Sequence, residues 1–332
     1  MSSVIGELDN RTIEFADKLL YAFLDINAEI TESYTYKEFN ERTKSLAQQL
    51  QKNYDLKKGE RVLLAYPAGL EMICAFYACA RIGVIPVPVY PPGQSGFKAS
   101  LSKIEFIARD CDASAVLTTH SYQWSYKLNM NREQHVSDTL DHLKWIATNT
   151  MQNVVEIDLK EEHSDILFLQ YTSGSTNDPK GVMVSHDNII DNFKNVVDHM
   201  PIGVSWLPQY HDMGLIGYYI FFALKGGTTY GFSPTDFIRR PSLWLEAISK
   251  FKGSASSAPN FAFEYCLMPG KISEDLLATL DLSSLRFFMN AAEPIDTKLF
   301  NEFVDKFSSY GLNAESSFAA YGLAENTLAV TN

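Results

Sequence analysis

Residues 171–181 read Tyr171-Thr-Ser-Gly-Ser-Thr-Asn-Asp-Pro-Lys-Gly181, a polar loop that lies between two more apolar segments. The segment before it, Asp165-Ile-Leu-Phe-Leu-Gln-Tyr171, is a short apolar run typical of a buried strand. Downstream of the loop, a helix is predicted over 185–197, with Ser185 in the N-cap position. A strand, a polar loop and a helix in this order indicate an α/β fold.

The same alternation continues on both sides of the loop. Further predicted strands are 60–66, 83–90, 113–119, 204–208 and 285–290, and further predicted helices are 70–81, 100–109, 243–251, 298–307 and an apolar helix around Phe221 that stops at Gly226. The prolines of 83–90 favour a sheet edge or a strand end. This alternation predicts βαβ units with mostly parallel sheets packed by helices. Residues 120–156 leave two interpretations open, a helical excursion or a loose connection.

Composition limits the classes of protein that fit. The chain has 332 residues, 46% of them hydrophobic, which supports a sizeable packed core. The net charge of −12 argues against a nucleic-acid surface. The four cysteines form no CxxC pair, and the N-terminus has no signal-peptide pattern. The longest near-apolar run, 213–224, is shorter than the ~20 residues that span a membrane. We therefore expect a cytoplasmic protein without a transmembrane segment.

The polar loop carries groups that suit a polyphosphate. Its hydroxyls and backbone N–H groups are donors, Gly174 allows close approach of a ligand, and Lys180 adds a positive charge. The positive end of the following helix is expected to contribute as well. Lys180 precedes Gly181, so the loop is not a Walker A motif, and it contains no Gly-x-Ser-x-Gly elbow. Taken alone, a loop of this composition also fits an ordinary turn.

The segment 171–181 resembles the signature loop of the adenylate-forming enzymes, which include acyl-CoA synthetases, peptide-synthetase adenylation domains and luciferases. It departs from the usual form at Asn177, where glycine is common. Further segments resemble that family's motifs in the family's order: Tyr34-Thr-Tyr-Lys-Glu-Phe39, Trp206-Leu-Pro-Gln-Tyr-His-Asp-Met-Gly-Leu-Ile-Gly217, Ser257-Ala-Pro-Asn-Phe-Ala262, Asn290-Ala-Ala-Glu-Pro294 and Tyr321-Gly-Leu-Ala-Glu325. The resemblance thus covers most of the chain.

Two of these segments narrow the resemblance to the fatty acyl-AMP ligases: His-Asp-Met-Gly at 211–214 and Ser-Ala-Pro-Asn-Phe at 257–261. Each residue also has an ordinary structural interpretation. His211 alone fits a structural histidine, Tyr321 a core or surface residue and Glu293 a surface charge. Trp206 and Phe261 fit packing residues, whether or not they also contact substrate.

The resemblance implies the large N-terminal domain of the adenylate-forming fold over 1–332, with two interlocked βαβ lobes at 58–200 and at 10–57 plus 201–332. The family's C-terminal lid domain, with its lysine that contacts the carboxylate and the α-phosphate, has no matching motif before Asn332. The chain ends soon after Glu325, which indicates a truncated chain. We therefore expect it to adenylate slowly, if at all.

The resemblance also implies residue roles. His211, Lys180 and Glu325 are expected to be catalytic, with His211 near the carboxylate and α-phosphate. Residues expected to bind ATP or AMP are Thr172, Ser173, Gly174, Ser175, Thr176, Lys180, Asp212, Asn290, Ala291, Ala292, Glu293, Tyr321 and Gly322. Residues expected to border the acyl site are Trp206, Met213, Gly214, Ile216, Ala258, Pro259, Asn260 and Phe261. Glu325 and Thr172 are expected to hold Mg²⁺, which prefers oxygen ligands.

The implied reaction is ATP-dependent activation of a long-chain fatty acid to an acyl-adenylate, with release of pyrophosphate. The implied acceptor is an acyl carrier protein, or a polyketide or peptide synthase. Two alternatives stay open: an acyl-CoA ligase of the same superfamily, and a non-catalytic binding module that keeps the fold. Lys180 and Glu325 argue against the second. The sequence gives neither the acyl chain length nor the oligomeric state.

Overall fold

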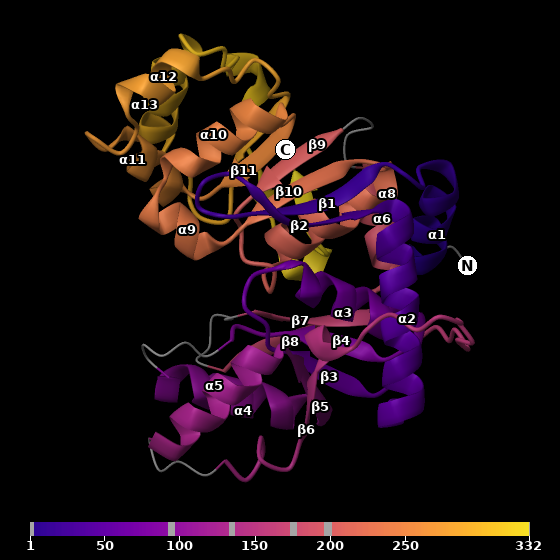
Figure 1. Ribbon diagram of the computed structural model, residues 1–332. Coiled ribbons are helices and arrows are strands. Elements are labelled where there is room, and N and C mark those ends of the chain that lie inside the picture. Colours follow the sequence, from indigo (N-terminus) through magenta and orange to yellow (C-terminus); the bar gives the residue numbers. More distant parts are fainter. Residues whose placement is uncertain (1–2, 92–96, 133–136, 173–177, 196–200, 332) are drawn as a thin grey trace. The chain divides into compact units, whose positions relative to one another are not determined.

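A computed structural model describes residues 3–91, 97–132, 137–172, 178–195 and 201–331. The chain folds into two compact units, coloured by sequence in Figure 1. The first comprises Met1–Asp9 and Lys37–Ile190, and the second comprises Asn10–Tyr36 and Asp191–Asn332. Both units are discontinuous in sequence, whereas of the expected lobes only the one at 10–57 plus 201–332 is; residues 37–57 fall in the first unit and residues 191–200 in the second. Helix α2 (Tyr36–Tyr54) belongs to the first unit because its polar side chains bind other segments of that unit.

The first unit contains a parallel four-stranded sheet in the order β4-β3-β5-β6. The strands are β3 (Arg61–Leu64), β4 (Ile85–Pro88), β5 (Ala113–Thr118) and β6 (Lys144–Ala147). Helices α3 (Leu70–Arg81), α4 (Phe97–Asp110) and α5 (His120–Arg132) connect them in turn, which confirms the predicted βαβ units. The proline-containing β4 is an edge strand, as expected for residues that lack an N–H donor.

The polar loop closes an antiparallel hairpin and does not lead into a helix. Strand β7 (Ile166–Thr172) pairs with β8 (Lys180–Ser185), and α6 (His186–Asn195) begins only after β8. The expectation that a helix N-terminus follows the loop directly is therefore wrong. Residues 180–185 contain two valines in alternation, a pattern that favours a strand. The predicted cap is confirmed, because Ser185 Oγ accepts from the Asn188 N–H at 3.0 Å.

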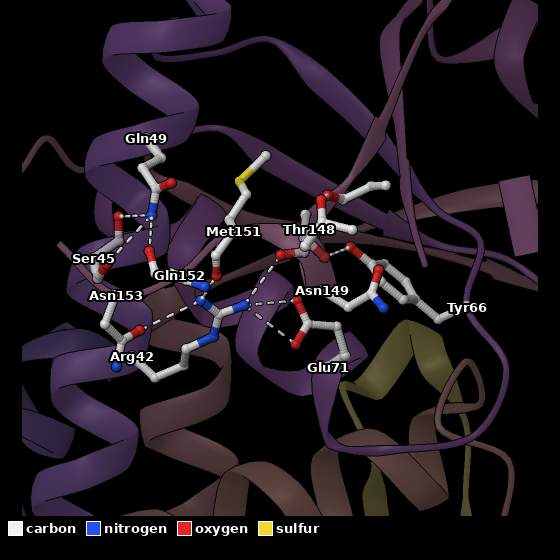
Figure 2. Close-up of polar contacts among 12 residues, drawn as sticks. Arg42, Ser45, Gln49, Tyr66, Glu71, Thr148, Asn149, Met151, Gln152 and Asn153 are labelled. Carbon is white, nitrogen blue, oxygen red and sulfur yellow. Dashed lines mark hydrogen bonds and ion pairs between the residues drawn. The ribbon is translucent and has the colours of Figure 1, made fainter. Parts of the chain in front are cut away.

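Residues 120–156 contain helix α5, strand β6 and the single turn η1 (Thr148–Thr150). After η1, residues 151–162, here called the strap, have little regular structure and are bonded along α2. Figure 2 shows the first residues of the strap, 151–153, beside Arg42, Ser45 and Gln49. Side chains on one face of α2 bind the strap: Arg42 to Met151 O, Ser45 to Val154 N, Gln49 to Gln152 O and Lys52 to Asp158. Gln48 and Gln51 bind it as well, through Asp158 N and Lys160 O. The segment is therefore a helical excursion followed by a tethered connection.

The Arg42 guanidinium is the centre of the contacts in Figure 2. It is 7% exposed, lies 3.0 Å from Glu71 Oε1 and donates to Thr148 O at 3.1 Å. The Thr148 hydroxyl lies 2.8 Å from Tyr66 Oη. These contacts join α2, α3 and η1 by a buried charge pair whose donors are satisfied by carbonyls, the arrangement that a buried ion pair requires.

The second unit contains a seven-stranded sheet in the order β13-β12-β11-β9-β10-β1-β2, and only the β1–β2 pair is antiparallel. The strands are β1 (Leu19–Leu24), β2 (Ile30–Thr35), β9 (Ile202–Ser205), β10 (Thr228–Phe232), β11 (Ala255–Ala258), β12 (Phe287–Asn290) and β13 (Ser317–Ala319). The mostly parallel pairing confirms the predicted α/β class. Because β13, β12, β11 and β9 are adjacent and parallel, their carboxyl ends lie along one edge.

A continuous helical segment runs from residue 212 to residue 225, and its middle part is a π-helix. It consists of α7 (Asp212–Gly214), the π-helical η2 (Leu215–Ile220) and α8 (Phe221–Lys225), and it ends at Gly226 with φ 73°. Hydroxyls from neighbouring strands bind its carbonyls: Thr229 Oγ1 donates to Tyr218 O at 2.6 Å, and Tyr21 Oη donates to Tyr219 O. The predicted stop at Gly226 is confirmed.

The second unit also contains shorter elements that flank the sheet. These are α9 (Pro234–Arg239), α10 (Ser242–Phe251), α11 (Asn260–Leu267), α12 (Glu274–Thr279), α13 (Thr297–Ser308), η3 (Ala314–Ser316), η4 (Ala324–Asn326) and a β14 (Tyr321–Gly322) to β15 (Ala329–Thr331) hairpin. Helix α1 (Val4–Glu14) opens the chain. Throughout the described ranges, every helix is too short or too polar to span a bilayer.

Candidate active site

The predicted site residues divide between the two units. Thr172 and Lys180 lie in the first unit, where they face each other across the β7–β8 hairpin. Ser173, Gly174, Ser175, Thr176 and the departure at Asn177 lie outside the described residues. Lys180 is exposed. A Cβ on Gly181 would lie 2.8 Å from the Tyr171 ring, so the glycine at this position admits the tyrosine.

The remaining predicted residues lie in the second unit, and most follow the carboxyl ends of four adjacent strands. Trp206 follows β9, Pro259 follows β11, Ala291 follows β12 and Tyr321 follows β13 after one residue. Register pairs Ala258 with Asn290 and Asn290 with Ala319. Motifs that are more than 100 residues apart in the chain therefore meet at one edge of the sheet. This edge is where open parallel sheets bind ligands.

His211 caps the helical segment and forms a close pair with its neighbour. His211 Nδ1 lies 2.6 Å from Asp212 Oδ1. The same carboxylate oxygen accepts a hydrogen bond from the Met213 N–H, at 2.6 Å. The hydrogen bond to Asp212 raises the pKa of His211 above its usual value. The His211 side chain is 52% exposed, whereas that of Asp212 is 13% exposed. The arrangement keeps a positive charge on an accessible imidazole to higher pH.

Two motif glycines are required by backbone that passes close to them. A Cβ on Gly214 would lie 2.2 Å from Pro208 O, and a Cβ on Gly322 would lie 2.2 Å from Leu328 O. At Gly322 the nearby backbone is that of Leu328, the residue directly before β15. Tyr321 itself is 56% exposed, which leaves its ring available for stacking.

Aromatic side chains form a layer beside the predicted acyl residues. Trp206 stacks on Phe237 at 4.0 Å and meets Phe261 edge-on at 5.7 Å. The Trp206 Nε1 atom is buried and has no hydrogen-bond partner among the described residues. Phe237 was missed from the sequence because α9 carries no recognisable motif. Ile216 and Ala258 are fully buried, Gly214 is buried, and Met213 is half-buried.

The turn after β12 is strained and clamped. Ala292 has φ 78°, a left-handed conformation that costs a non-glycine residue about 1–3 kcal/mol. Asn290 is fully buried and donates from Nδ2 to Asn260 Oδ1 at 2.9 Å. The exposed Glu293 accepts from the Asn260 N–H at 2.7 Å, at the first turn of α11. Asn260 was expected to border the acyl site, but its side chain is bonded to the turn.

Glu325 is an exposed carboxylate in η4, close in sequence to Tyr321. Within the ranges that the structure describes, acidic, histidine and cysteine side chains form no group of three or more that could hold a metal ion. A single carboxylate suits Mg²⁺, which is bound through one or two carboxylates together with waters and substrate phosphates. Glu325 therefore fits the role expected of it by its chemistry and exposure.

Comparison with known proteins shows which family the chain resembles along its length. A family model described as AMP-binding enzyme matches residues 14–332. The medium-chain-fatty-acid–[acyl-carrier-protein] ligase JamA of Moorena producens is 35% identical over 99% of this chain. The long-chain-fatty-acid–AMP ligase FadD32 of Mycobacterium marinum is 31% identical over 95% of this chain. The chain spans about half the length of these relatives, 56% and 51% respectively.

Solved structures give the same likeness. The crystal structure of fatty acid AMP ligase from Legionella pneumophila matches with a TM-score of 0.86 and 34% identity, over 99% of this chain and 56% of that one. A structure of fatty acyl-adenylate ligase from L. pneumophila in complex with acyl adenylate and pyrophosphate matches with a TM-score of 0.85 and 34% identity, over the same shares of the two chains.

Proposed function

Because this chain belongs to the family of AMP-binding enzymes, we propose that it takes part in the ATP-dependent activation of a fatty acid as an acyl-adenylate. The observation that carries the proposal is the edge formed by β9, β11, β12 and β13, where the motif residues meet. The activities of the similar ligases support a fatty acid as substrate. The acceptor that we propose is an acyl carrier protein, the acceptor in the name of JamA.

In the proposed reaction a carboxylate oxygen of the fatty acid forms a bond to the α-phosphorus of ATP. The bond from that phosphorus to the bridging oxygen breaks, and pyrophosphate leaves with the electron pair. The protein aligns the two oxygens and neutralises charge, because the step needs no covalent enzyme intermediate. Its contribution is therefore positioning and electrostatics.

The described residues supply these effects as follows. His211, kept protonated to higher pH by Asp212, places positive charge beside the carboxylate and the α-phosphate. Tyr321 stacks on the adenine, and a stacked base contributes about 1–3 kcal/mol. Ala292 and Glu293, in the turn after β12, border the adenine as well. The aromatic layer of Trp206, Phe237 and Phe261 borders the acyl chain.

Lys180 and the polar loop hold the β- and γ-phosphates. Mg²⁺ would be held by Glu325, and when bound it supplies positive charge to the phosphates.

The test uses an acyl-sulfamoyl-adenosine, a non-hydrolysable mimic of the acyl-adenylate, and measures its binding by calorimetry. We expect binding by the 332-residue chain, and we expect pyrophosphate release when a longer protein that includes this chain is given ATP and a long-chain fatty acid. Failure of the mimic to bind would contradict the proposal. Product analysis with coenzyme A present tests the acyl-CoA ligase alternative, since a thioester would identify it.

Lys180→Ala tests the alternative of a non-catalytic module. We expect this change to weaken ATP binding roughly 10-fold, because a lysine that pairs with phosphate is lost. The matched control is Lys57→Ala, a lysine that is 69% exposed and paired only with Asp55 among the described contacts. Equal ATP affinity in both variants, with and without Mg²⁺, would favour the non-catalytic module.

A further inference from the structure

Asn260, the first residue of α11, uses its whole side-chain amide to bind the turn that follows β12. Its Nδ2 donates to Pro294 O at 2.7 Å, and its Oδ1 accepts from Asn290 Nδ2 at 2.9 Å and from the Asp296 N–H at 3.0 Å. Its own N–H donates to Glu293 Oε1 at 2.7 Å. The residue is therefore bonded to both ends of the turn and to one side chain within it.

The bonded turn contains the strained Ala292, with φ 78°. A left-handed non-glycine residue persists where the surrounding structure determines its conformation. Asn260 bonds to Asn290, which precedes Ala292 in the chain. It also bonds to Pro294 and Asp296, which follow Ala292. The Asn260 amide thus spans the strained residue and fixes the separation of its two flanks.

The position of Asn260 in the chain links this turn to the other side of the site. The residue follows Ala258 and Pro259 at the end of β11 and precedes Phe261, whose ring packs on Trp206. Its sequence context therefore suggests an acyl contact. Its hydrogen bonds instead commit the side chain to the turn 291–296, on which the proposed function places the adenine.

We propose that Asn260 is a positioning residue for the nucleotide side of the site: it holds the strained turn 291–296 in the conformation that receives the adenine. The inference rests on the proposed function, which makes this turn a nucleotide-binding element. Asn260 acts through the backbone of the turn and not by contact with the acyl chain. The two roles differ in what they predict for a ligand that has no acyl chain.

The test compares AMP with the acyl-sulfamoyl-adenosine in calorimetric binding to the 332-residue chain. Asn260→Ala removes the amide, so the turn relaxes and AMP binding weakens roughly 10-fold, and binding of the mimic weakens by a similar factor. An acyl contact would leave the affinity for AMP unchanged and weaken only that for the mimic. AMP affinity within twofold of wild type therefore overturns the inference.

The matched control is Asn313→Ala, which removes the asparagine that caps η3 in the same unit. Asn313 is exposed, and its Oδ1 accepts from the Glu315 N–H at 2.9 Å. This change is expected to reduce thermal stability with no change in AMP affinity. A similar loss of AMP binding in both variants would mean that general destabilisation explains the effect, and it would overturn the inference.

A second variant adds a readout that a merely structural role would not move. Ala292→Gly removes the steric strain at φ 78°, because glycine adopts this conformation without penalty. In the Asn260→Ala background it is expected to restore part of the AMP affinity. If Asn260→Ala weakens AMP binding and Ala292→Gly restores none of the lost affinity, the clamp is refuted.

Asn260→Asp provides the answer if Asn260→Ala does not fold. The carboxylate keeps an acceptor for Asn290 Nδ2 and the Asp296 N–H but loses the donor to Pro294 O. We expect a smaller loss of AMP affinity than for alanine, and unchanged AMP affinity would overturn the inference. Absence of AMP binding by the wild-type chain would instead contradict the proposed function, and with it the premise of the inference.

Discussion

Replacement of Gly214 by alanine tests the geometry of the His211 turn. The added Cβ would lie 2.2 Å from Pro208 O, whereas ordinary contact with such an atom begins near 3.4 Å. Backbone must therefore move by about 1 Å, the difference between those two distances. Pro208 O also accepts from the His211 N–H at 3.1 Å, so a displaced carbonyl shifts His211 as well.

Two opposing effects set the size of the change in stability. Overpacking of this kind costs about 1–3 kcal/mol. Alanine gains about 1 kcal/mol over glycine in a helix. We therefore expect Gly214→Ala to lower the free energy of unfolding by about 0–2 kcal/mol. The functional effect is larger, because a displacement of about 1 Å near the reacting groups can cost on the order of 100-fold in rate.

Gly217→Ala, in the same helical segment, is the matched control. A Cβ on Gly217 meets only Leu328 Cδ2, at 3.6 Å, which is ordinary van der Waals contact. Urea unfolding and calorimetry with the acyl-adenylate mimic should separate the two variants. The control is expected to bind the mimic as wild type does, and Gly214→Ala is expected to bind it at least 10-fold more weakly. Wild-type binding by Gly214→Ala would refute the reasoning.

Three further outcomes follow from charges in the structure. Arg42→Met should lower the free energy of unfolding by about 3–5 kcal/mol in urea, because Glu71 is left as an unpaired, largely buried carboxylate, and a loss below about 1 kcal/mol would contradict this. Asp212→Asn should lower the pKa of His211, measured by NMR titration, because the hydrogen bond to the Asp212 carboxylate is lost; an unchanged titration midpoint would count against the pair. In the wild-type chain the pair stabilises the fold at low pH, and this stabilisation is lost as pH rises through the raised pKa. Burial lowers the pKa of His186 to about 4, so about 3 kcal/mol of stability is lost as pH falls from 6.5 to 4, and His186→Gln should flatten that dependence in pH-dependent urea unfolding.

Elements with strong local patterns were predictable from the sequence. Helix 70–81 and strand 113–119 match α3 and β5 closely, because each is an uninterrupted apolar run with clear boundaries. Strand β8 was not found, because the motif ahead of it suggested a loop that leads into a helix. The β1–β2 hairpin was missed as well, since its pairing with the distant β10 is what defines it.

The sequence predicted the order of the motifs along the chain, but it did not predict that they meet at one edge of the sheet. The strand order β13-β12-β11-β9 brings them together, and sequence spacing does not give that order. The roles of single side chains were harder to predict from the sequence. Nothing local distinguishes an asparagine that contacts ligand from Asn260, whose bonds reach the turn 291–296.

The strap bears on which substitutions the first unit should tolerate. Arg42 and Gln49 bind main-chain carbonyls of the strap, and Ser45 binds a main-chain N–H. These main-chain atoms stay in place when the side chains of the strap residues that carry them are replaced. The sequence of residues 151–154 is thus largely interchangeable, while the length of the strap is not, because a deletion would move every carbonyl out of reach of its helical donor. Asp158 and Glu161 are exceptions, because their carboxylates pair with Lys52 and with the buried Arg81. Saturation mutagenesis should record this asymmetry as a permissive strap beside an intolerant stripe on α2.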